Sequence, residues 1–173
     1  MWSLAASLIA GFATTFVPGP AMHVRPVDEF IGGVLREGAV RSPTMRRLLM
    51  RLEDDDVIVY VAPGSRSDER DPAHLQFVSG PVGQRYLRIT INLLGDRRAM
   101  AALLAHELHH AREVATHPDV IDQESMERLY EQLGWRRPGR TSAFETRGSI
   151  AVAARVLAEM AGLMPGTTKA GSR

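Results

Sequence analysis

Residues Arg97 to Ala115 read RRAMAALLAHELHHAREVA, and this stretch decides the fold. Its apolar residues recur at the three- and four-residue spacing of an α-helix. Asp96 directly before the stretch is a suitable N-cap, and Pro118 lies just beyond its end. We therefore predict one long helix over this stretch. Its many Ala and Leu residues indicate that the helix is largely buried.

The predicted helix contains the pattern H-E-x-x-H, formed by His106, Glu107 and His110. Residues four apart lie on one helix face, so both imidazoles can reach the same metal ion. Glu107 is rotated by roughly 100° from His106 and can flank the metal ion without binding it. There it can act as a general base toward a water molecule. Zinc suits such a site, because His ligands and one open position lower the pKa of its water. A metal-free structural helix that carries two hydrogen-bonded or exposed His residues is the alternative.

A hydrolytic zinc site needs a third protein ligand. The later candidates are His117, Asp119, Asp122 and Glu145. His109 lies between the two ligand positions, and we expect it on the surface or behind a ligand rather than at the metal ion.

Shorter patterns surround the central helix. β-branched or alternating stretches predict strands over 57–61, 75–79 and 86–92. The last of these alternates buried and polar residues, which is typical of an antiparallel or edge position. Helices are predicted over 43–52, over 123–133, and from a cap at Thr141 or Ser142 to about Leu163. We therefore expect an α+β domain over residues 22–164, in which a small antiparallel or mixed sheet packs against the central helix.

Composition limits the partners of this 173-residue chain. Its formal net charge is +1, which gives no reason to expect nucleic acid. It has no cysteine, which excludes Cys-ligated zinc and thiol nucleophiles. No Asp, Glu, Lys or Arg occurs from Met1 to Val24, and the apolar run from Leu4 to Val17 is too short to span a bilayer. We expect a signal peptide over 1–21, a secreted or periplasmic protein without a stable membrane span, and a disordered tail over 165–173. An ordinary N-terminal core helix is the alternative to the signal peptide.

His106-Glu107-x-x-His110, followed some thirty-five residues later by Glu145, resembles the gluzincin branch of the zincin metallopeptidases in a minimal single-domain form. The resemblance implies hydrolysis of a peptide or protein substrate, with Zn²⁺ held by His106, His110 and Glu145 and with Glu107 as catalytic base. It also implies that an edge strand binds the substrate backbone by strand addition, a role expected here for Tyr86–Asn92. A catalytically inactive, zinc-stabilised binding domain of the same fold is the alternative function.

Two positions after Glu145 bear on this resemblance. Gly148 matches the small residue that many gluzincins place three after the Glu ligand. Ser149 stands where they have Asp, so the partner of one His ligand would be a weaker hydrogen-bonding group. Tyr130 is a candidate for stabilising the oxyanion, but we expect it to be a packed helix residue.

Reach favours Glu145 over His117 as the third ligand. His117 lies just past the end of the central helix, and Pro118 directs it toward an extended conformation rather than a tight return. The longer connection to Glu145 lets the chain turn back. Glu145, expected in the first turns of the last helix, can then lie against the central helix.

Overall fold

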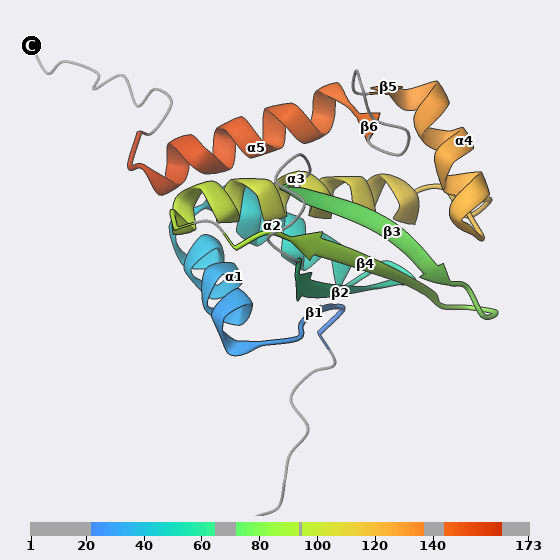
Figure 1. Cartoon of the computed structure of the whole chain (residues 1–173), viewed down its shortest axis with the longest axis horizontal. Coiled ribbons are helices and arrows are strands. Elements are labelled where there is room, and N and C mark those ends of the chain that lie inside the picture. The colour runs from blue at the N-terminus through green and yellow to red at the C-terminus, as the bar shows by residue number, and fades with distance from the viewer. Residues whose placement is uncertain (1–21, 65–71, 94, 137–143, 164–173) are drawn as a thin grey trace, which may run out of the picture.

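Helix α3, Arg97–Ala115, lies across a four-stranded sheet and carries the H-E-x-x-H pattern (Figure 1). The computed structural model describes residues 22–64, 72–93, 95–136 and 144–163. The bounds of α3 confirm the prediction, because the Asp96 side chain accepts a hydrogen bond from the N–H of Arg98 and so begins the helix there.

The sheet is mixed, with the order β1-β2-β4-β3. Its strands are β1 Val24–Pro26, β2 Val57–Pro63, β3 Ala73–Ser79 and β4 Arg85–Ile91. β1, β2 and β4 are parallel, and β3 is antiparallel to β4. The expectation that Tyr86–Asn92 forms the edge strand is wrong, because β4 has a neighbour on each side. Its alternating burial instead arises because α3 covers one face of the sheet, and the edge strands are β1 and β3.

The remaining helices pack around α3 (Figure 1). α1, Glu29–Arg41, and α2, Pro43–Leu52, lie beside it, and α4, Gln123–Leu133, lies near β3. α5, Arg147–Met160, packs along α3 on the side away from the sheet. The bounds of α2 and α4 match the prediction, whereas α1 lacks a clear sequence signal.

One hydrophobic core fixes how α3 is rotated about its axis. Val59, Leu87 and Ile89 of the sheet meet Leu104 and Leu108 of α3, and each is at most 1% exposed. Burying side chains of this size stabilises the fold by about 1.5–3 kcal/mol each. Because these Leu residues must face the core, the His and Glu side chains of the motif lie on the flanks of the helix.

The chain is therefore α+β with a mixed sheet against a central helix, as predicted at this level. The expected signal peptide, 1–21, and the expected tail, 165–173, lie outside the described residues. Within the described part of the chain, no helix combines the length and the apolar character needed to cross a membrane.

Candidate metal centre

The two His residues of the motif face each other on α3. His106 Nε2 lies 3.2 Å from His110 Nε2, and their ring centroids are 4.8 Å apart in an edge-on arrangement. This contact follows from the four-residue spacing, which stacks the two side chains on one side of the helix. His110 is 4% exposed, and the His106 side chain is 13% exposed. His106 is therefore the imidazole nearer to solvent.

Glu145 reaches His106 from a different element. Its Oε2 lies 3.3 Å from His106 Nε2. Glu145 belongs to the two-residue strand β6, Phe144–Glu145, which pairs antiparallel with β5, Trp135–Arg136. The expectation that Glu145 lies in the first turns of the last helix is therefore wrong. The proposed cap at Thr141 or Ser142 lies outside the described residues.

Helix α5 begins directly after Glu145 because of a capping box. The Thr146 side chain accepts from the N–H of Ser149, and the Ser149 hydroxyl accepts from the N–H of Thr146. Such reciprocal bonds satisfy N–H groups that the first helical turn leaves without helix partners. Ser149 is thus held within this box, so the expectation that it serves a His ligand finds no support in its contacts.

The measured distances fit two edges of a tetrahedral zinc site. Metal–ligand bonds of about 2.0 Å place tetrahedral ligands about 3.3 Å apart. The His106–His110 and His106–Glu145 separations are 3.2 and 3.3 Å. Convergence of three donors on one point is a stricter condition. Among the described residues, no group of three or more His, Cys, Asp or Glu side chains meets it. The 3.2 Å separation also suits a proton shared between the two imidazole nitrogens.

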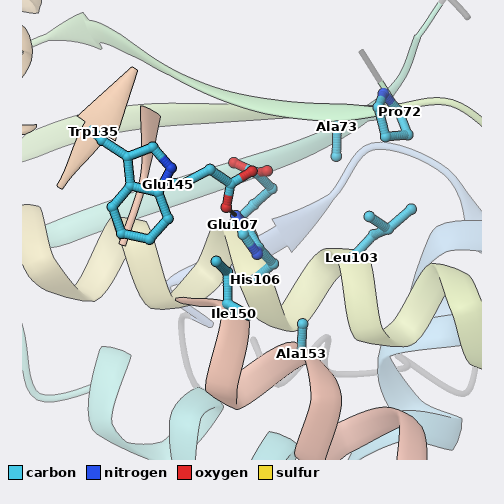
Figure 2. A pocket seen from close by; sticks show the side chains of 9 residues that line it. All are labelled: Pro72, Ala73, Leu103, His106, Glu107, Trp135, Glu145, Ile150 and Ala153. Atoms are coloured by element: carbon cyan, nitrogen blue, oxygen red, sulfur yellow. Dashed lines mark ion pairs between the residues drawn. The ribbon is translucent and has the colours of Figure 1, made fainter. Parts of the chain in front are cut away.

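Glu107 adds a second carboxyl group to the site, beside that of Glu145. It is 7% exposed and lines the same cleft as His106 and Glu145. Figure 2 shows the two carboxyl groups and the His106 ring directed into one space. A carboxylate in this position can take a proton from a water molecule held between it and the His side chains.

Glu113 is the residue that the sequence reasoning missed. Its Oε2 lies 2.8 Å from His110 Nδ1, and its Oε1 accepts a 2.7 Å hydrogen bond from the Thr146 hydroxyl. Burial raises the pKa of Glu113, but the hydrogen bonds from His110 and Thr146 outweigh it and lower the pKa below its ordinary value. The sequence feature that could have identified Glu113 is its three-residue spacing from His110, which places both side chains on one helix face.

Three other candidates, His117, His109 and Tyr130, make their printed polar contacts outside the space between His106, His110 and Glu145. His117 Nδ1 lies 2.7 Å from the backbone oxygen of Glu113, at the end of α3. His109 Nε2 is 3.5 Å from Glu113 Oε1, and burial lowers the pKa of His109. The buried Tyr130 donates a 2.8 Å hydrogen bond to the backbone oxygen of His110, which confirms the expected packing role.

A cleft of about 470 Å³ opens over the cluster. Its described lining comes from the start of β3, from α3, from β5 and β6, and from α5: Pro72, Ala73, Leu103, His106, Glu107, Trp135, Glu145, Ile150 and Ala153 (Figure 2). These side chains include two carboxyl groups and one imidazole but no Arg or Lys. A bound cation would offset the cost of holding two carboxylates in so confined a space.

Comparison of this chain with protein-family models, curated proteins and solved structures found no match. A function is therefore inferred from the residues of the chain itself.

Proposed function

We propose that this chain is a zinc-dependent peptidase of zincin-like architecture, with His106, His110 and Glu145 as metal ligands. The observation that carries the proposal is the meeting of the H-E-x-x-H face of α3 with the Glu145 carboxylate, 3.3 Å from His106. Two imidazoles and one carboxylate are a ligand set that suits zinc and leaves one position open for chemistry. The same three residues were expected from the sequence.

Zinc bound there would polarise the scissile carbonyl and favour ionisation of the attacking water. Glu107 is the group that moves protons. As the water oxygen bonds to the carbonyl carbon, the Glu107 carboxylate takes one water proton, and it then donates that proton to the leaving nitrogen as the C–N bond breaks. The products are a carboxylic acid and an amine. Glu107 is 7% exposed and lines the cleft, so a bound substrate can reach it.

The edge strand β3 offers a place for an extended substrate. The N–H of Asn92 donates to the oxygen of Pro72, so the alternate residues Ala73, Leu75 and Phe77 direct their backbone groups away from β4. The N–H of Phe77 is already bonded to the Gln123 side chain of α4 at 3.0 Å. Strand addition is therefore favoured at the start of β3, where Ala73 also lines the cleft.

An open cleft beside the general base supports catalysis over the alternative, a zinc-stabilised binding domain. In that alternative the metal ion would hold the fold together without needing access for a substrate. Here His106 and Glu107 both line the opening. A cleft that meets an edge strand suits an extended peptide chain, because the strand can bind the peptide backbone.

The test combines metal content with activity on a broad peptide library. The wild-type chain should bind about one zinc ion. Glu107→Gln should keep zinc and lose activity by at least ~10²–10⁴-fold, the usual contribution of a general acid–base group. Glu124→Gln is the control, because that side chain is 82% exposed on α4. Loss of zinc in Glu107→Gln would make Glu107 a ligand, and a zinc-loaded wild type that cleaves no peptide would favour the binding domain.

The ligand set is tested by two further variants. Glu145→Ala should weaken zinc binding strongly, because it removes one of three protein ligands. His117→Ala should leave zinc binding nearly unchanged, because its ring bonds to the backbone at the end of α3. The opposite result would remove Glu145 from the ligand set and reject the gluzincin assignment.

A further inference from the structure

We propose that Glu113 and Thr146 form a positioning pair that builds the metal site, by fixing the His110 ring and tying it to the segment that carries Glu145. This inference rests on the proposed zinc function. Neither residue touches the reacting atoms, so both would act through the ligands.

Glu113 fixes the orientation and the tautomer of His110. Glu113 Oε2 lies 2.8 Å from His110 Nδ1, and a hydrogen bond from this nitrogen to the carboxylate would place the ring proton on Nδ1. The opposite nitrogen, Nε2, then presents its lone pair on the side of His106, where it can bind a metal ion. Because Glu113 lies at the other ring nitrogen, it cannot share that metal position. A carboxylate behind a ligand His also makes the imidazole a better donor to the metal.

The second oxygen of Glu113 ties two parts of the fold together. Oε1 accepts the 2.7 Å hydrogen bond from the hydroxyl of Thr146, which is 3% exposed and directly follows Glu145. Thr146 is also the N-cap of α5, so its backbone is held in place by the start of that helix. The Glu113 carboxylate thereby contacts both the His110 ring and Thr146, the residue next to Glu145. The contact joins α3, which carries His106 and His110, to the residue directly after Glu145 of β6.

Position 149 is Ser in this chain, and Glu113 supplies the carboxylate that an Asp would provide there. In the resembling enzymes that Asp would come from the helix after the Glu ligand. In this chain the carboxylate comes from α3 itself, three residues after His110, and reaches the second helix through a hydroxyl. Side chains three apart on a helix are neighbours, so little conformational freedom is lost in forming this contact.

The experiment measures zinc dissociation constants of the full chain by competition with a chromophoric chelator. Glu113→Gln preserves volume but removes the charge, and it should weaken zinc binding by about 10–100-fold, as is typical for a group behind a ligand. Thr146→Ser retains the hydroxyl and should bind zinc like the wild type. Thr146→Asp retains a good helix cap but loses the donor, so it should lose affinity in the same direction. Glu124→Gln is the matched control on an exposed surface.

A second measurement separates positioning from general loss of stability. Co²⁺ in place of zinc should give a visible absorption spectrum that is altered in Glu113→Gln and unchanged in Thr146→Ser, while circular dichroism shows both variants folded. Wild-type affinity and an unaltered Co²⁺ spectrum in Glu113→Gln would overturn the proposal, as would equal binding by the Ser and Asp variants of Thr146. Failure of the wild-type chain itself to bind zinc is a different result, and it would reject the zinc function first.

Discussion

Gly134 carries no side chain that could bind a metal ion, yet we predict that Gly134→Ala disables the proposed metal centre. A Cβ atom added at Gly134 would lie 2.0 Å from the backbone oxygen of Glu145, whereas real Cβ atoms essentially never come within 3.0 Å of such a neighbour. The gap must therefore open by 3.0 − 2.0 = 1.0 Å. The clashing atom is backbone rather than the end of a flexible side chain, so the backbone itself must shift, and we expect β6 to move and carry Glu145 with it.

The magnitude follows from the tolerance of a metal site. Ligand distances in zinc sites hold within about 0.2 Å of their ideal values, so a 1 Å shift exceeds that range. Misplacement by 1 Å can reduce the rate of an enzyme by ~10²-fold. Overpacking of this kind also destabilises a fold by about 1–3 kcal/mol. We expect zinc affinity and peptidase activity to fall together in Gly134→Ala, with a smaller loss of stability in urea denaturation.

Gly95→Ala is the matched control, because a Cβ atom there meets no described atom within 4 Å. It should leave zinc affinity unchanged. Zinc titration of the folded variants, followed by chelator competition, compares the two directly. If Gly134→Ala is folded and binds zinc as tightly as the wild type, the β5–β6 contact does not position Glu145, and the reasoning from the close approach fails.

Three further predictions test parts around the site. Gly148→Ala places a Cβ atom 2.4 Å from His109 Nε2, so the His109 ring must turn away. Zinc affinity should hold, and its loss would show that His109 supports the site, either at the metal ion or through its contact with Glu113 Oε1. Tyr130→Phe removes a buried hydrogen bond to His110 and should cost about 1 kcal/mol in urea denaturation, with zinc retained. Burial raises the pKa of Glu159, but hydrogen bonds from the start of α2 lower it below 4.5 overall. The stabilisation is therefore present above that pH and lost as the pH falls below it, so thermal melts of the wild type and Glu159→Gln should differ at pH 7 and converge in acid.

Local signals were sufficient for α3 and for most of the other elements. Asp96 caps α3 where the sequence places a cap, and Gly134 ends α4 where a glycine interrupts the pattern. The strands at Val57 and Arg85 agree with the predicted stretches within a few residues, because β-branched and alternating residues describe them directly. Each of these signals lies within the element that it predicts.

Features that depend on tertiary contacts were not predicted correctly from the sequence: α1 was missed, and β4 was expected at an edge of the sheet. Helix α1 contains Gly32, Gly33 and Gly38, which lower its intrinsic helix propensity. It forms because Asp28 caps it and because Ile31, Val34 and Leu35 bury one face of the helix. Gly38 allows α2 to approach closely, since an added Cβ atom would lie 3.2 Å from Met45 Cγ. The position of β4 inside the sheet likewise depends on pairing with β2 and β3, which no pattern within the strand specifies.

The candidate site divides in the same way. His106, Glu107 and His110 share one helix, so their arrangement follows from helix geometry. Glu145 was expected near them because the chain can turn back, but its strand conformation depends on pairing with Trp135. Glu113 received no role in the sequence analysis, because a three-residue spacing from a His is common on helices. Its role becomes visible when its distance to His110 is measured.

In the proposed zinc site, metal binding and the packing of α5 would stabilise each other. The Glu113–Thr146 hydrogen bond already joins α3 to the start of α5, and the approach of Glu145 to His106 joins α3 to β6. Zinc bound as proposed would strengthen the contact between Glu145 and His106, because the full set of ligands exists only when β6 is packed against α3. A ligand that binds the folded state alone stabilises it by about 2.7 kcal/mol at a hundred times its dissociation constant. The stability gained on adding zinc is therefore a measure of the site that requires no substrate, and it should vanish in variants that lack either His106 or Glu145.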